Sequence, residues 1–288
     1  MPSGLVHTWA VVDGVPQLVD VAPDGTPGDA ATTEFHDGPV VAGGGRHVAF
    51  VSRDGGLATS EPTASGSGPF GYVRDLDAET TVLAAVDTRG NPVGPRGLDI
   101  SHDGDVVTYE GFGWVGDVRD SFMFVHDLST GTVAWVADAD GSPVPGNNGG
   151  DTPAISADGR RVAFTQDLPL LPEDDNIGHD TYVFDTLVGT LEVMSVTPDG
   201  TTGNTTATNG GDIRGISGDG RWVAFSSHST DLIPGEVVRE NAMYLRDRQE
   251  GTTILLSRRL DGSPVTDQQS FGDPRMSDNG AWVAFRGS

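Results

Sequence analysis

The sequence predicts an all-β protein, a five-bladed β-propeller with four antiparallel strands in each blade. The main evidence is a phrase of the form Ser-x-Asp-Gly-x-x-Val-Ala-Phe, which recurs along the chain. The aromatic residues that close its copies lie at positions 50, 109, 164, 225 and 285, so successive copies are 59, 55, 61 and 60 residues apart. A period of this length, built from short strand signals, is typical of a unit that stacks on copies of itself to bury its faces. The 41 Gly and 18 Pro residues favour strands joined by turns.

The elements of one unit follow from its local sequence. Apolar alternation predicts the strands, and Asp-Gly pairs predict tight turns, because Gly tolerates positive φ and Asp binds the nearby backbone. In the third unit we expect strands at Ala154–Ser156, Arg161–Thr165, Thr181–Asp185 and Leu191–Val196, with a turn at Asp158-Gly159 and a long polar loop at Gln166–Asp180. Four antiparallel strands in about 60 residues is the pattern of a propeller blade.

The two ends of the chain predict a shared blade. Residues 8–37 have the pattern of a third and a fourth strand, and residues 276–286 that of a first and a second. We therefore expect one domain over residues 1–288, in which these half-blades pair and complete blades occupy about 38–97, 98–152, 153–214 and 215–275. Such pairing would remove the open sheet edges that invite aggregation. The alternative is a piece cut mid-blade from a larger ring.

The composition limits the partners. The net charge is −25, and all 17 basic residues are Arg. Such an excess of acid repels phosphates and anionic lipids, so we expect neither nucleic acid nor membrane insertion. Cysteine is absent, which excludes disulfides and thiolate chemistry. No signal-peptide pattern is visible, and we expect a monomer.

The repeated phrase, followed by an aromatic strand that ends in Arg-Asp or His-Asp, resembles the repeats of the TolB-like propellers, which are Asp-rich relatives of the WD-repeat blades. The resemblance covers essentially the whole chain. It implies a propeller fold and a periplasmic or secreted location, although a cytoplasmic one stays open. It does not imply one function, because similar blades dock proteins, gate peptidases and carry polysaccharide lyases.

The candidate binding face is the rim with the long loops. Loops at Arg53–Pro69, Gly111–Asp120, Gln166–Asp180 and His228–Asn241 share one rim with the blade connections, and binding residues concentrate on such loops. At the start of the first strands of the blades, we expect a carboxylate ring that binds a cation such as Ca²⁺ through Asp37, Asp151 and Asp212. The candidate binding residues at this channel mouth are His36, Asp37, Arg96, Asp151, Asp212, Asp273 and Arg275. The alternative is that each Asp caps its own turn.

Two other acidic segments are candidate sites. Asp138–Ser142 resembles the start of a Ca²⁺ loop, but Gly149 stands where the closing acid belongs, so we expect a turn. Glu173–Asn176, with His179 and Asp180, could hold a metal, grip a basic partner or form a solvated loop tip. The Ser and Asp of the repeated phrase recur in most blades, so we interpret them as turn devices.

These observations favour a non-enzymatic binding propeller that docks a protein, a peptide or a glycan on the long-loop rim, with or without a bound cation at the channel mouth. Its acidity favours a cationic partner. No catalytic residue is assigned, since Gly-x-Ser-x-Gly, His-Glu-x-x-His and a Walker loop do not occur. The alternatives are a glycan hydrolase or lyase with carboxylates at the channel mouth, and a fragment of a larger propeller-peptidase.

Overall fold

The computed structural model describes residues 7–28, 38–59, 68–146, 152–205, 213, 215–238, 241–266 and 271–287. Every regular element among them is a β-strand, as the sequence predicts. The chain forms two compact units, Met1–Trp135 and Val136–Ser288. Within the described ranges, no helix has the length and apolar character that crossing a membrane requires.

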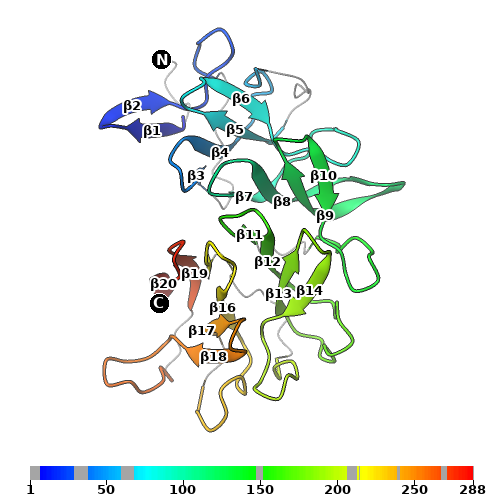
Figure 1. The fold of residues 1–288 in the computed structure, drawn as a ribbon, viewed down its shortest axis with the longest axis vertical. Helices are drawn as coiled ribbons and strands as arrows, with labels where there is room; N and C mark the ends of the chain where they lie inside the picture. Colours follow the sequence, from blue (N-terminus) through cyan, green and yellow to red (C-terminus); the bar gives the residue numbers. More distant parts are fainter. Residues whose placement is uncertain are drawn as a thin grey trace. The chain divides into compact units, whose positions relative to one another are not determined.

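The first unit contains ten strands. They are β1 (Trp9–Val12), β2 (Val15–Leu18), β3 (Val40–Val41), β4 (His47–Ser52), β5 (Phe70–Asp75), β6 (Thr80–Leu83), β7 (Arg96–Ile100), β8 (Val106–Val115), β9 (Val118–Asp127) and β10 (Thr132–Trp135). β3 to β6 and β7 to β10 form two four-stranded antiparallel sheets in chain order, and β1 pairs with β2 alone (Figure 1).

The second unit repeats this plan. Its strands are β11 (Ala154–Ile155), β12 (Arg161–Gln166), β13 (Asp180–Asp185), β14 (Thr190–Val193), β15 (Gly215–Ile216), β16 (Trp222–Ser227), β17 (Ala242–Asp247), β18 (Thr252–Leu255), β19 (Phe271–Met276) and β20 (Val283–Gly287). β11 to β14 and β15 to β18 form four-stranded sheets, and β19 pairs with β20. The described residues thus hold four complete blade-like sheets. The count of five blades and the pairing of residues 8–37 with 276–286 stay predictions.

An aromatic pair lies at the centre of each complete sheet. Phe164 of β12 stacks on Tyr182 of β13 with ring centroids 5.6 Å apart, and Phe225 and Tyr244 repeat this contact at 5.7 Å. These four rings are fully buried. Because the first of each pair closes the repeated sequence phrase, the 55- to 61-residue period of the sequence is the period of the core.

The Ser-x-Asp-Gly phrase forms the turn between the first and second strands, as predicted. Ser156 donates its hydroxyl proton to Asp158 Oδ1 at 2.5 Å, and the same carboxylate oxygen accepts the amide of Arg160 at 3.0 Å. Gly159 has a φ of +69°, which a side chain would strain. The same Ser-Asp bond recurs at Ser101 and Ser217, so these residues are structural.

The connections after β2, β6, β10, β14 and β18 share one feature. In the described ranges, an isolated bridge closes each of them: Val21 with Pro27, Val86 with Pro92, Ala137 with Pro143, Val196 with Thr202, and Arg258 with Pro264. Asp138 Oδ1 accepts the amides of Asp140 and Ser142 at 2.9 Å each, so this segment is a turn, as predicted.

The prediction of a loop at Gly111–Asp120 is wrong. β8 and β9 continue through it as a hairpin arm that turns at Gly116, where φ is +56°. Gly113 explains the extension, because a Cβ at this position would lie 2.7 Å from the Cβ of Asp87. The preceding connection therefore packs directly on the arm, and Asp87 Oδ2 accepts the Trp114 amide at 3.1 Å.

Candidate functional site

Most of the predicted carboxylate ring lies outside the described residues. His36, Asp37, Asp151 and Asp212 fall in segments that the structure does not describe. The ring and its Ca²⁺ therefore stay predictions. Among the described residues, no group of three or more His, Asp or Glu side chains could hold a metal ion.

The other predicted binding residues lie in β7 and β19. Arg96 is the first residue of β7 and is exposed, opposite Glu110 of β8. Asp273 lies in an irregular part of β19 with a φ of +51° and pairs with Arg286 at 3.2 Å. Arg275, in the same strand, is exposed and pairs in register with Ala284. Asp273 therefore already has a cationic partner within its own hairpin.

A different acidic site lies at the other segment that the sequence singled out, the loop between β12 and β13. Asp180, the first residue of β13, is fully buried. It stands two positions before the buried aromatic of its strand, where the other complete sheets have Phe70, Phe122 and Ala242. A carboxyl group thus replaces an apolar side chain at one core position of the third sheet.

The polar contacts of Asp180 tie three segments together. Its Oδ1 accepts the hydroxyl proton of Ser195 at 2.5 Å, and its Oδ2 accepts the side-chain amide of Asn176 at 2.7 Å. Asn176 also donates to the carbonyl of Gly203 at 3.0 Å. The long loop, β13 and the connection after β14 therefore meet at this carboxyl. Burial raises the pKa of Asp180 to about 6, and the nearby Asp174 also raises it.

Asp174 is the second buried carboxyl, with 6% of its surface exposed. Tyr182 donates its hydroxyl proton to Asp174 Oδ2, whereas in two other sheets the equivalent tyrosine donates to a loop carbonyl, that of Asp54 or Ser229. Asp174 Oδ1 is buried and has no hydrogen-bond partner among the described residues. Burial raises the pKa of Asp174 as well, with smaller contributions from Asp175 and Glu173.

The outer surface of this loop is acidic and partly apolar. Glu173 and Asp175 are exposed, as are Ile177 at 70% and Leu168 at 46%. Residues 166–180 contain no Arg and no Lys. We call this surface, Leu168, Glu173, Asp175 and Ile177, the acidic loop surface.

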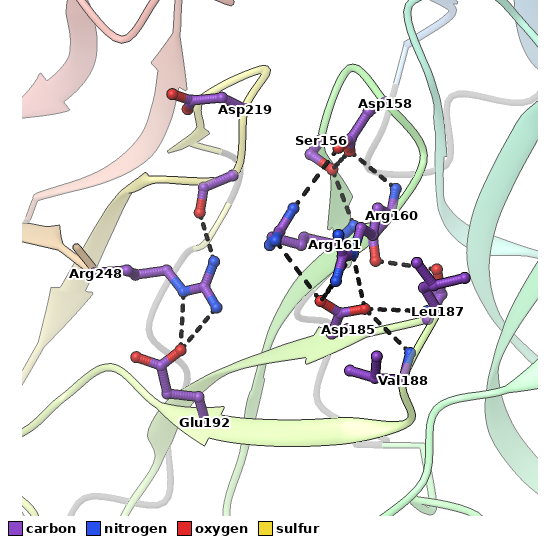
Figure 2. A network of polar contacts seen from close by, with 12 residues as sticks. Ser156, Asp158, Arg160, Arg161, Asp185, Leu187, Val188, Glu192, Asp219 and Arg248 are labelled. Carbon is purple, nitrogen blue, oxygen red and sulfur yellow. Dashed lines mark hydrogen bonds and ion pairs between the residues drawn. The ribbon is translucent and has the colours of Figure 1, made fainter.

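The opposite end of the same sheet holds the arginines. Figure 2 shows Arg160 and Arg161 around Asp185, with Arg160 Nε 3.0 and 2.9 Å from its two carboxylate oxygens. Asp185 also accepts the amides of Leu187 and Val188, and Arg248 of the next sheet pairs with Glu192 at 2.7 Å. In the next sheet Arg221 pairs with Asp247 in the same way. Arginine side chains therefore neutralise the carboxylates at the tight turns of this sheet. The β12–β13 loop, at the other end, has carboxylates but no Arg or Lys.

The hairpin arm of β8 and β9 is a site that sequence reasoning missed. It carries Phe112, exposed at 55%, with the guanidinium of Arg119 4.9 Å from its ring centroid. Arg89 stacks on the neighbouring Trp114 at 4.0 Å. The sequence signal that could have predicted this arm is the alternation of Phe112 and Trp114 with Gly111 and Gly113.

Neither a protein-family model nor any curated protein sequence matches the chain. Solved structures do. An oligogalacturonate lyase from Vibrio parahaemolyticus is 14% identical with a TM-score of 0.55, over 99% of this chain and 66% of the other. TolB from Acinetobacter baumannii is 16% identical with a TM-score of 0.48, over 94% and 51%. The β-propeller domain of the Trilobed protease from Pyrococcus furiosus is 14% identical with a TM-score of 0.48, over 88% and 64%.

The chain spans about half the length of that TolB structure and about two thirds of the lyase. At these identities the likeness concerns the fold alone. The repeated four-stranded antiparallel sheets make this chain an all-β protein, and the solved structures that it resembles include a β-propeller domain. That fold serves both binding and catalysis.

Proposed function

We propose that the chain is a binding module that docks a cationic, partly apolar peptide segment of another protein on the acidic loop surface. The observation that supports this proposal is the division of charge along the third sheet. Arginines neutralise the carboxylates at its tight turns, whereas the β12–β13 loop exposes Glu173 and Asp175 beside Ile177 and contains no basic Arg or Lys.

Such a surface recognises its partner by charge and by apolar contact together. Carboxylates on an ordered loop attract a cationic chain and speed its encounter, and salt weakens this attraction. Ile177 and Leu168 supply apolar area that excludes water around the charged contacts. Asp180 is fully buried, out of reach of a bound chain, so the site favours binding over catalysis. The resemblance to TolB-like repeats further supports a location outside the cytoplasm.

A labelled peptide of alternating arginine and leucine, titrated with the full chain, tests the proposal by fluorescence anisotropy. We expect binding that weakens as salt rises, and no binding of the matched glutamate–leucine peptide. The double variant Glu173→Lys with Asp175→Lys should weaken binding by at least tenfold.

The matched control places the same charge change at the other rim. Glu250→Lys with Asp278→Lys alters two exposed carboxylates near the tight turns of β17–β18 and β19–β20. This control should bind the peptide within about twofold of the wild type after allowance for net charge. Equal losses in both double variants would show diffuse attraction to the acidic chain, and the proposal would be rejected.

A second candidate function is the docking of an acidic glycan on the hairpin arm. Arg119 stacks on Phe112 and makes no ion pair among the described residues, so its guanidinium can bind a carboxylate while Phe112 offers an apolar face. The likeness to an oligogalacturonate lyase makes an oligouronate the first probe. The tryptophan fluorescence of the chain, to which Trp114 contributes, should respond to this probe in the wild type and not in Arg119→Gln. Turnover that Asp151→Asn or Asp212→Asn abolishes would instead support the enzyme alternative.

A further inference from the structure

Among the described residues, no arginine acts on the buried carboxyls of Asp174 and Asp180. The ionisable groups that act on them are Glu173, Asp175, Tyr182 and His179, and of these only His179 can become positive. The elements packed around them contribute neutral groups: Ser195 after β14, Asn176 in the loop and the Gly203 carbonyl in the connection. Two carboxylates buried without an Arg are costly, since an ionised group in an apolar setting must be neutralised.

A proton fits this site better than a metal ion. Of the carboxyls described at this site only two are buried, and no group of three metal-binding side chains occurs among the described residues. Both oxygens of Asp180 already accept hydrogen bonds, from Ser195 and Asn176. A proton needs no cavity and no further ligands. It also suits Asp174, whose Oδ1 has no partner among the described residues, because a neutral carboxyl loses far less than a carboxylate when it is desolvated.

We propose that Asp174 and Asp180 form a proton-binding pair that latches the β12–β13 loop to its sheet in mild acid and releases it towards neutral pH. The tyrosine geometry gives the mechanism. Tyr182 Oη lies 3.4 Å from the Leu168 carbonyl. When Asp174 carries a proton on Oδ2, it can donate to Tyr182, and Tyr182 can donate to Leu168, which restores the tyrosine-to-loop bond that Tyr72 and Tyr244 make in their sheets.

The direction of the effect follows from linkage. The closed loop holds its carboxyls with raised pKa values, and in an open loop they return to the ordinary range, so the closed form binds more protons. Opening therefore becomes easier as the pH rises from about 4 to about 6 and changes little above that. Because the acidic loop surface lies on this segment, the latch would regulate the docking proposed above, although its own test needs no ligand.

Amide hydrogen exchange of the full chain measures the latch. In peptides that cover residues 167–179, corrected for intrinsic exchange, the opening constant should rise about 100-fold between pH 4 and 7, which corresponds to a shift of about two pKa units. The loop at residues 229–238 is an internal control, because Ala242 takes the place of Asp180 after it. Its opening constant should stay within a few-fold.

Variants separate the proton from other causes. Asp180→Asn should remove most of the rise, Asp174→Asn should remove a smaller part of it, and His179→Gln should leave the rise in place. If either Asp variant fails to fold, the comparison of the two loops in the wild type still decides. An unchanged opening constant, a rise shared by both loops, a rise that His179→Gln removes, or protection restored at pH 7 by 5 mM Ca²⁺ would overturn the proposal. Failure of the peptide to bind, with the latch intact, would reject only the docking function.

Discussion

Asp180 occupies in β13 the position that Phe70 occupies in β5. Each is two residues before a fully buried tyrosine, Tyr182 or Tyr72, and each is buried itself. This difference is informative because the other complete sheets have the same strand arrangement with an apolar residue at this position. A carboxyl at an apolar core position costs stability, so its presence points to a role beyond packing.

The first prediction concerns global stability. Because the pKa of Asp180 is raised to about 6, the folded state binds more protons than the unfolded chain between about pH 4 and 6. The free energy of unfolding in urea should therefore fall by about 2 kcal/mol from pH 4 to pH 7 through this residue. Asp180→Asn should flatten most of that slope. An equal slope in wild type and variant would refute the assignment.

The second prediction concerns the tie between Arg221 and Asp247. Two hydrogen bonds of 2.9 and 2.6 Å join them, and they lower the pKa of Asp247 to about 2. Arg221→Ala should reduce the free energy of unfolding at pH 7 by about 1–2 kcal/mol, because it leaves a buried carboxylate, while the partly exposed guanidinium limits the loss.

This loss should shrink as the pH falls towards 2, because the lowered pKa stabilises only the ionised form. Urea titrations at pH 7 and pH 3 measure it. Glu250→Ala is the matched control, since Glu250 is 4.0 Å from the same arginine but exposed, and it should change stability by less than about 0.5 kcal/mol. A larger effect from Glu250→Ala than from Arg221→Ala would contradict the prediction.

The third prediction concerns the proposed closure of the chain ends. In the complete sheets, the residue before the second-strand aromatic pairs with the residue after the third-strand aromatic, as Ala224 does with Leu245. Trp9 pairs with Leu18 as Tyr244 pairs with Leu255, so Trp9 is the third-strand aromatic of the N-terminal half-blade. If the half-blades join, Ala284 should therefore lie opposite Ala10.

Since the chain has no cysteine, the double variant Ala10→Cys with Ala284→Cys reports this contact without interference. Oxidation should form an intramolecular disulfide, visible as a faster band on a non-reducing gel. Val12→Cys with Ala284→Cys, which shifts the register by two residues on the same face, should form it poorly. Equal yields, or no disulfide in either, would argue against this register.

The fourth prediction concerns the carboxylate ring of Asp37, Asp151 and Asp212. A ligand that binds only the folded state raises its stability, so Ca²⁺ at about 100 times its dissociation constant should raise Tm on the order of 5 °C. Asp151→Asn should reduce the shift, and Asp138→Asn, within a turn, should not. No shift at millimolar Ca²⁺ would remove the cation from the proposal.

The strand pattern could be predicted from the sequence because its causes are local and repeated. The turn at Asp158 and Gly159 needs only neighbouring backbone groups, so its phrase identifies it in each copy. The hairpin arm at Phe112 was missed because its extension depends on packing against Asp87, 25 residues earlier. The burial of Asp180 was missed for the same reason: contacts with Ser195 and Asn176, which lie on other segments, place that carboxyl in the core.

The five connection turns have a consequence for how such a protein changes over generations. Each closes on itself through a bridge such as that between Ala137 and Pro143, so the bridge itself forms whichever sheet follows. Duplication or deletion of the roughly 60 codons between two of these turns would join equivalent ends and leave every hairpin intact. Recombination can therefore alter the number of repeats in one step, while a carboxyl such as Asp180 arises later in a single copy.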